Sequence, residues 1–396
     1  MNPIPSLKRS AWLNDPHLQQ VMDVITRGGG EVRIAGGAVR NALMGVPIAD
    51  VDLATTMMPK DVMGVCKAAG FGVHPTGFEH GTITVVNNHM PFEVTTLRRD
   101  IATDGRRAVV AFTNDWAEDA MRRDFTMNAM YCDSVGKIYD FTNGYEDLLR
   151  NKVRFVGDAN ERIKEDYLRI LRFFRFYARF GKGVPDRIGL AACGKHKSGL
   201  KKISVERIRQ EMFKLVVAPR SIQTLKAMSA TGVLKTIIPC TDDWRLIGRL
   251  PDDPLLRLYA LAKEPENLKE VLRLSNVEAL RVDALIAAPD LSPRLQMREQ
   301  RALLYHLGKQ AWVDVVQMNW ARGRAAKTDQ KWQALIDLPR RWAIPKIPIN
   351  GKDLLEAGIA TGPYMGEVLQ RLEDWWVASD FAPSRENLLE RLKNDA

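Results

Sequence analysis

The chain has 396 residues, a hydrophobic fraction of 45% that is ordinary for a soluble protein, and a formal net charge of +10. This length suits two or three folding units, and the charge favours a polyanionic partner. No stretch approaches the ~20 apolar residues of a membrane helix, so we expect no membrane partner. The four cysteines are widely spaced and the N-terminus lacks the apolar run of a signal peptide, which predicts a cytoplasmic protein with reduced thiols.

The first motif combines two glycines with the start of a helix. A short apolar strand, Val32–Ala35, leads into Gly36 and Gly37, and a helix begins near Ala38. Glycines let backbone N–H groups approach a phosphate closely, and the start of a helix adds its positive end. We therefore expect this turn to hold a phosphate.

Acidic residues follow on a second predicted strand. This strand carries Asp50 and Asp52, whose side chains point the same way, about 7 Å apart, because side chains alternate along a strand. Two such carboxylates repel each other unless a cation lies between them, and their hard oxygen atoms suit Mg²⁺. Metal-binding carboxylates beside a phosphate cradle are the parts of a two-metal phosphoryl- or nucleotidyl-transfer site.

A predicted hairpin, with strands Thr82–Val86 and Met90–Thr96, carries Glu93. If its second strand lies beside the strand of the aspartates, Glu93 is a third carboxylate for the same metal ions. Otherwise it is an ordinary surface glutamate on an exposed strand face.

The segment Arg98–Trp116 is densely charged and has no clear periodicity, so we predict a mobile loop. The next segment, AEDAMRRDFTMNAM over residues 117–130, places apolar residues on one side and leaves polar ones to face the site. Arginine suits a triphosphate because its planar fork pairs two oxygens at once; the alternative is a salt-bridged helix surface. The polar residues in question are Arg122, Arg123, Asp124 and Asn128.

Further along, apolar residues at helical spacing predict one helix over about residues 159–180. Near its start, Asp166 and Arg169 are three residues apart and so lie on one face, where they form either an ordinary ion pair or a binding pair. A second amphipathic helix, Ile203–Leu215, carries Arg207, which we expect to support this region rather than to contact RNA.

From about residue 221 the chain is predicted to be helical, and four of its tryptophans are interleaved with basic residues. Such a pattern suits RNA, because the basic groups neutralise phosphates and the rings stack on bases. The alternative, that the rings belong to the core, remains equally open. The tryptophans are Trp312, Trp320, Trp332 and Trp342.

Taken in order, the motifs GGxVR, DVDLAT, RRDFTMNAM and EDxxR resemble those of the class II tRNA nucleotidyltransferases. These are the CCA-adding enzymes, and bacterial poly(A) polymerases are their relatives. The resemblance runs from Gly36 to about Lys214 and departs from the usual GGxVRD at Asn41. It implies an α+β fold: a polymerase-β-like nucleotidyltransferase head with a small mixed sheet over residues 1–150, then an all-α neck over 151–220 and an all-α body and tail over 221–396.

The resemblance also implies roles for the motif residues. Asp50 and Asp52, with Glu93 assisting, are expected to be catalytic and to bind Mg²⁺. The neck is expected to recognise the base, and the body and tail to bind tRNA. The expected nucleotide-binding residues are Gly36, Gly37, Arg40, Arg122, Asp124, Asn128, Asp166 and Arg169.

The EDxxR motif is assigned base recognition in the family, which carries this role onto Asp166 and Arg169. A carboxylate only accepts hydrogen bonds and a guanidinium only donates them. Cytosine and adenine both offer an amine beside an acceptor nitrogen, whereas uracil and guanine present the opposite polarity and leave polar groups unpaired. One such pair can therefore select CTP and ATP without a template.

We therefore expect template-independent addition of CMP, CMP and AMP, from CTP and ATP, to tRNA lacking part or all of its 3′ CCA. A poly(A) polymerase shares the head chemistry, but the segment GFEHGTITVV has the form found in CCA-adding enzymes. A specialist that adds only CC or only A remains open, although the segment Arg98–Trp116, which in similar enzymes helps the switch from C to A, is long enough for full addition. A non-catalytic RNA-binding protein is disfavoured because both aspartates are present. The sequence identifies no protein partner.

Overall fold

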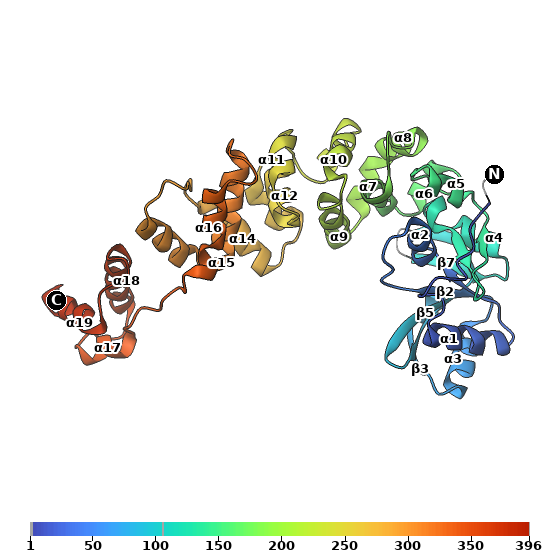
Figure 1. The fold of residues 1–396 in the computed structure, drawn as a ribbon, viewed down its shortest axis with the longest axis horizontal. Helices are drawn as coiled ribbons and strands as arrows, with labels where there is room; N and C mark the ends of the chain where they lie inside the picture. The colour runs from blue at the N-terminus through green and yellow to red at the C-terminus, as the bar shows by residue number, and fades with distance from the viewer. Residues whose placement is uncertain (1–2, 105–106, 396) are drawn as a thin grey trace. The chain divides into compact units, whose positions relative to one another are not determined.

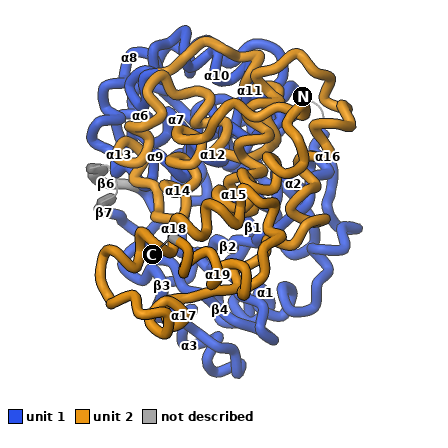
Figure 2. The backbone as a smooth tube through the Cα atoms, turned by 90° about the vertical axis from the view of Figure 1, so that its left-hand side faces the viewer, with its two compact units in different colours: residues 1–239 blue, residues 240–396 orange. Residues whose placement is uncertain are grey.

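The computed structural model describes residues 3–104 and 107–395, and the chain divides into two compact units, residues 1–239 and 240–396 (Figure 2). Within the described residues, the sheets lie in the first unit and the second is built from helices (Figure 1). This confirms the α+β class. The predicted boundaries at residues 150 and 220 stay predictions. No helix among the described residues has the length and apolar character needed to cross a membrane.

A mixed sheet organises the first unit. Its strands are β1 (Val32–Ala35), β2 (Asp52–Thr55), β3 (Gly72–Gly77), β4 (Thr82–Asn87), β5 (Met90–Thr96), β8 (Met130–Cys132) and β9 (Ile138–Asp140). They lie in the order β3-β4-β5-β2-β1-β8-β9, in which β2 pairs antiparallel with β1 and parallel with β5. The predicted first strand and the hairpin are confirmed. The second strand begins only at Asp52, so Asp50 lies just before it rather than in it.

Three helices surround this sheet: α1 (Pro16–Arg27), α2 (Gly37–Met44) and α3 (Pro59–Ala68). Asp15 caps α1 by accepting hydrogen bonds from the backbone N–H groups of His17 and Leu18. Helices α1 and α3 pack against each other beside β4 (Figure 1). Helix α2 begins at the second glycine, Gly37, next to the predicted start near Ala38.

The segment Arg98–Trp116 does not form the predicted loop. It forms a two-stranded hairpin, β6 (Arg98–Asp104) and β7 (Arg107–Phe112), which leads into the short helix α4 (Trp116–Met121). The register of the hairpin shifts between Asp100 and Ala102, and such a shift interrupts the alternation by which a strand is identified from sequence. The prediction of a loop was therefore wrong.

The segment after α4 is anchored in the core of the first unit. It contains η2 (Thr126–Asn128) and precedes α5 (Gly144–Leu149). Phe125 is fully buried, and its ring lies 5.1 Å from the rings of both Phe155 and Phe176. These aromatic contacts hold the RRDFT segment against the helix that carries Phe176.

The single helix predicted over residues 159–180 is two helices. They are α6 (Ala159–Glu165) and α7 (Leu168–Phe180), followed by α8 (Arg187–His196), η3 (Lys197–Lys202), α9 (Val205–Val216) and α10 (Ser221–Ala230). The break falls at Asp166, which has extended backbone angles and whose carboxylate accepts a hydrogen bond from the Leu168 N–H at 3.0 Å. A side chain that accepts a hydrogen bond from a nearby backbone N–H competes with the hydrogen bonding of the helix.

The second unit is a series of helices with a buried apolar interior. They are α11 (Trp244–Arg249), α12 (Pro254–Leu261), α13 (Leu268–Val271), α14 (Asn276–Ala287), α15 (Met297–Arg322), α16 (Gln330–Arg341), α17 (Gly351–Glu356), α18 (Pro363–Ala378) and α19 (Arg385–Asp395). Trp312 is fully buried and donates to the Leu335 carbonyl at 2.8 Å, so it belongs to the core. Trp320 and Trp332 stack with ring centres 6.2 Å apart and remain half-buried.

Candidate active site

A cavity of about 460 Å³ in the first unit brings together residues from the glycine turn, the RRDFT segment, α7 and α9. All eight residues predicted to bind nucleotide line it, although they come from distant parts of the chain. The lining residues are Gly36, Gly37, Arg40, Asp52, Arg122, Arg123, Asp124, Asn128, Asp166, Leu168, Arg169, Arg172, Phe176 and Arg207. Asp50 and Glu93 are not among them.

The glycine turn has a conformation that suits a close approach. Gly36 has a φ of +67°, in the left-handed region, and a Cβ atom there would lie 3.1 Å from Nη1 of Arg123. Its own N–H donates to the Met130 carbonyl at 3.0 Å and is therefore already used. The first N–H groups of α2, from Gly37 onward, have no partner within the helix and are the ones that can face an anion.

Carboxylates gather where β2 begins. Asp52 is paired in register with Glu93 on the parallel neighbour β5, which confirms that the strand of Glu93 lies beside Asp52. Partial burial, followed by the charges of Glu93 and Asp50, raises the pKa of Asp52, while Arg123 opposes this shift. The three acidic groups therefore repel one another, as expected for carboxylates that together bind a cation.

The donor set fits a hard divalent cation, because all three groups offer carboxylate oxygens. In the described part of the chain, however, no three acidic, histidine or cysteine side chains already converge closely enough to hold a metal ion. Asp50, Asp52 and Glu93 are all exposed, so their side chains have room to rotate toward one ion.

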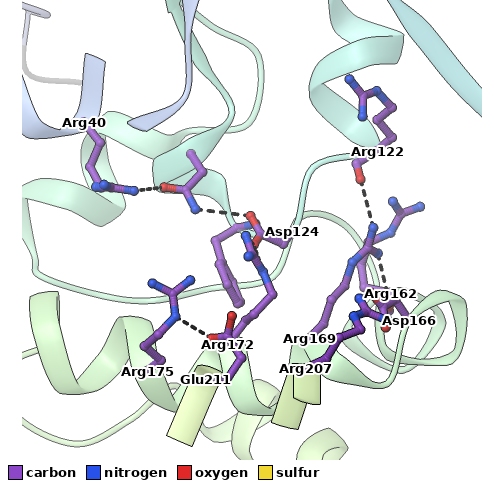
Figure 3. Close-up of polar contacts among 12 residues, drawn as sticks. Arg40, Arg122, Asp124, Arg162, Asp166, Arg169, Arg172, Arg175, Arg207 and Glu211 are labelled. Carbon is purple, nitrogen blue, oxygen red and sulfur yellow. Dashed lines mark hydrogen bonds and ion pairs between the residues drawn. The ribbon is translucent and has the colours of Figure 1, made fainter. Parts of the chain in front are cut away.

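A chain of hydrogen bonds crosses the cavity (Figure 3). Arg40 donates to the Asn128 side chain, and Asn128 donates to Asp124 at 3.2 Å. Asp124 also accepts two hydrogen bonds from Arg172, at 2.8 and 2.5 Å. Burial disfavours the Asp124 carboxylate, but Arg172, Asn128 and Arg169 together outweigh this effect and lower its pKa. Asp124 thus orients Asn128 and Arg172 and offers little free acceptor capacity to a ligand.

Arg40 is held without a carboxylate partner among the described contacts. Its Nε and Nη2 atoms donate to the side-chain oxygen of Asn41 at 3.1 and 2.8 Å, and its guanidinium lies 4.4 Å from the centre of the Phe180 ring. Burial, and next the charge of Arg179, lower its pKa to about 10. Asn41, the residue that departs from the family motif, therefore orients Arg40 without neutralising its charge, which leaves that charge available to an anion.

The two residues predicted to read the base have separate supports (Figure 3). Asp166 accepts a hydrogen bond from Nη2 of Arg207 at 2.7 Å, which confirms the supporting role expected for Arg207. Arg169 donates to Glu165 and, at 3.2 Å, to the Arg122 carbonyl. The described contacts include no ion pair between Asp166 and Arg169, so the alternative of an ordinary i,i+3 ion pair is not formed; the helix break at Asp166 explains this.

Arg123 and Arg172 line the cavity but were not among the residues expected to bind nucleotide. Arg172 lies one turn after Arg169 on α7, and this helical spacing was a usable signal. Arg123 was already among the polar residues that the pattern of residues 117–130 left facing the site, although the resemblance gave it no role. Arg122 also lines the cavity, but its side chain bonds Asp119 and points away from Arg169 (Figure 3).

Comparison with known proteins agrees with this geometry. Residues 32–154 match the family described as "Poly A polymerase head domain", residues 190–245 match "Probable RNA and SrmB- binding site of polymerase A", and residues 255–392 match a tRNA nucleotidyltransferase domain 2.

Relatives of similar length include the mitochondrial CCA tRNA nucleotidyltransferase 1 of Danio rerio, which is 38% identical over 91% of this chain and 87% of its own. The CCA-adding enzyme of Latilactobacillus sakei is 31% identical over 94% of this chain and 96% of its own. Among solved structures, the Bacillus stearothermophilus CCA-adding enzyme in complex with CTP aligns with a TM-score of 0.81 and 28% identity, over 96% of this chain and 98% of its own. On this evidence the chain belongs to the CCA-adding tRNA nucleotidyltransferases of the tRNA nucleotidyltransferase/poly(A) polymerase family.

Proposed function

We propose that this protein adds CMP, CMP and AMP to the 3′ end of tRNA that lacks part or all of its CCA, taking CTP and ATP and releasing pyrophosphate. One observation carries the proposal: a single cavity holds the acidic start of β2, the glycine turn and the Asp166–Arg169 region. Catalytic carboxylates, an anion site and a base-reading site are the three parts that nucleotide transfer without a template needs. The names of the relatives support the same reaction.

Asp50, Asp52 and Glu93 would hold the divalent cations, and Mg²⁺ is the ion that we propose. Its support is the all-oxygen donor set and the raised pKa of Asp52, which has burial as its largest cause and then the charges of Glu93 and Asp50. When bound, such ions lower the pKa of the attacking 3′-hydroxyl and neutralise charge on the leaving pyrophosphate.

Arginines supply the remaining positive charge. Arg40, Arg123 and Arg172 come from three different segments and line the same cavity. Arginine binds phosphate oxygens with two parallel hydrogen bonds, so this set suits a triphosphate better than a single charge would. Asp124 and Asn128 fix two of these arginines in advance, which reduces the ordering needed on binding.

Base selection follows from hydrogen-bonding capacity. Each oxygen of Asp166 accepts one hydrogen bond from the protein, and a carboxylate has about four acceptor positions, so it can still accept an exocyclic amine. The described contacts of Arg169 use Nη1 and Nη2, and its Nε–H stays available for a ring nitrogen. CTP and ATP satisfy both groups, while UTP and GTP satisfy neither.

The test is incubation of the protein with tRNA lacking CCA and with each nucleotide in turn, with and without EDTA. We expect CMP and AMP incorporation that EDTA abolishes and Mg²⁺ restores. Asp52→Asn should still bind tRNA but lose incorporation by at least about a hundredfold, since even outer partners of a metal ligand are worth 10–100-fold. Asp158→Asn, at the start of α6 and outside the cavity, is the matched control and should be fully active. Near-normal CMP incorporation by Asp52→Asn would refute the proposal.

A cytoplasmic location is also our proposal, supported by the buried free thiols Cys66, Cys132 and Cys193, which suit a reducing compartment. The Danio rerio relative is named as a mitochondrial protein. Cell fractionation followed by immunodetection of this chain distinguishes the two compartments.

A further inference from the structure

One buried carboxylate outside the cavity contacts the arginines that line it. Asp119 lies on α4 with 1% of its surface exposed, and it is not part of the cavity lining. It accepts hydrogen bonds from Nε of Arg122 at 2.7 Å, from Nη2 of Arg123 at 3.0 Å and from the Tyr131 hydroxyl at 2.6 Å. The Arg98 N–H, where the β6–β7 hairpin begins, also donates to it at 3.3 Å.

These contacts determine where the Arg123 guanidinium points. Nη2 is bound by Asp119, and Nε donates to the Tyr131 hydroxyl at 3.1 Å. The remaining nitrogen, Nη1, lies against the glycine turn, 3.1 Å from the position that a Cβ of Gly36 would occupy. The described contacts give Nη1 no protein acceptor, and the charge of Arg123 is felt at Asp52. Two of the three nitrogens are therefore used for orientation, and the third faces the cavity.

We propose that Asp119 is a positioning residue for triphosphate binding: its carboxylate, together with the Tyr131 hydroxyl, holds Arg123 so that Nη1 faces the anion at the glycine turn. The inference rests on the proposed function, because that function places the triphosphate there. A long arginine side chain free in solution must be ordered when a ligand binds, and a prior contact removes this cost. Asp119 itself touches no substrate.

The alternative is that Asp119 only stabilises α4 as part of a buried ion cluster. The two roles differ in one measurable respect. If Asp119 acts through Arg123, its substitution has no further effect on nucleotide binding once Arg123 is gone, whereas independent effects add. A double-mutant cycle on nucleotide affinity therefore separates them.

The experiment measures the dissociation constant of CTP by equilibrium binding to the full-length protein and its variants. Asp119→Asn keeps the size of the side chain but replaces one acceptor with a donor, and we expect CTP binding roughly five- to tenfold weaker, the scale of one side chain that must be ordered on binding. Arg123→Gln should weaken binding further, and the double variant should match Arg123→Gln alone. Multiplying effects, or unchanged binding by Asp119→Asn, would overturn the proposal.

Two further variants keep the test decisive. Tyr131→Phe removes only the hydroxyl that bridges Asp119 and Arg123, so it should weaken CTP binding severalfold even if Asp119→Asn does not fold; unchanged binding here also overturns the proposal. Asp147→Asn is the matched control, because Asp147 is equally buried in the same unit and bonds Thr126 at 2.8 Å and Arg154 at 3.3 Å. It should bind CTP normally, and an equal loss would show that any buried acid has this effect.

CTP binding does not require tRNA extension. A wild-type protein that binds CTP but adds no nucleotide would therefore refute the proposed function, while the CTP affinities of the variants would still test the role of Asp119.

Discussion

Replacing Asp166 with asparagine should relax the discrimination between CTP and UTP. The substitution preserves shape but changes hydrogen-bonding polarity, because an amide has one acceptor and one donor group. In the wild type, Nη2 of Arg207 donates to the Asp166 carboxylate at 2.7 Å. The amide oxygen of the asparagine should keep this hydrogen bond, because a bond from a charged donor is stronger than one from a backbone N–H. The NH₂ group then takes the place of the other oxygen, so it loses the hydrogen bond from the Leu168 N–H and can donate to the O4 carbonyl of uracil.

The magnitude follows from the contacts. On the proposed base reading, UTP would place its O4 carbonyl against the Asp166 carboxylate and its N3–H against the Arg169 guanidinium of the wild type, so two polar groups would lose their partners. Both side chains are largely buried, with 20% and 14% of their surfaces exposed. Each unpaired group costs about 1–3 kcal/mol, which predicts a total of about 2–6 kcal/mol against UTP. Asp166→Asn removes one mismatch for UTP and creates one for CTP, whose amine then meets the NH₂ group, so discrimination should fall by about 2–6 kcal/mol, or roughly 30-fold at least.

The assay compares kcat/KM for CTP and UTP incorporation into tRNA that ends before the CCA sequence. Asp158→Asn is a suitable control, because Asp158 caps the same helix α6 from its other end and asparagine is an equally good capping residue. The control should retain the wild-type ratio of CTP to UTP. A ratio for Asp166→Asn within twofold of wild type would remove Asp166 from base reading.

Two other substitutions test the supports of the cavity. Gly199→Ala would place a Cβ 2.0 Å from Cδ1 of Tyr167, beside the helix break, so we expect a loss of about 1–3 kcal/mol in the free energy of unfolding and weaker CTP binding. Gly194→Ala is the control, because the nearest atom to its Cβ would be 3.5 Å away. Equal denaturation curves for the two variants would contradict this reasoning. Asn41→Asp would give Arg40 an anionic partner, so the free energy of unfolding at neutral pH should rise by about 1 kcal/mol while CTP binds more weakly. Chemical denaturation and equilibrium binding measure both changes, and a less stable Asn41→Asp protein would count against the burial of an unneutralised Arg40.

Local chemistry predicted the catalytic end of the fold well. The glycine turn, the strand before it and the hairpin that carries Glu93 depend on short patterns, and the structure places each of them as expected. The base-reading region was predicted less well, because its geometry depends on distant residues. The break at Asp166 is stabilised by Arg207, 41 residues later, and by the Tyr167 ring packed on Gly199. Helical periodicity contains no information about such contacts.

The other differences between the predictions and the structure also arise from features that a local sequence pattern does not contain. The register shift in the β6–β7 hairpin hides its strands from a search for alternation. The burial of Trp312 cannot be distinguished from an RNA-facing position by counting nearby basic residues, since both patterns place aromatic and charged residues together. The residue assignments for metal and nucleotide binding stay predictions until the variants described above are measured.

If Asp166 and Arg169 read the base as we propose, their separate supports have a consequence for the evolution of nucleotide choice. The acceptor is steadied from α9 by Arg207, and the donor is steadied from α6 by Glu165. Inverting the preference toward UTP and GTP would require a donor at position 166 and an acceptor at position 169, and each would then face a supporting side chain of the wrong polarity. Four coordinated replacements would be needed, three on helices and one at the break between α6 and α7, so single mutations would blur the selection of C and A but would not redirect it.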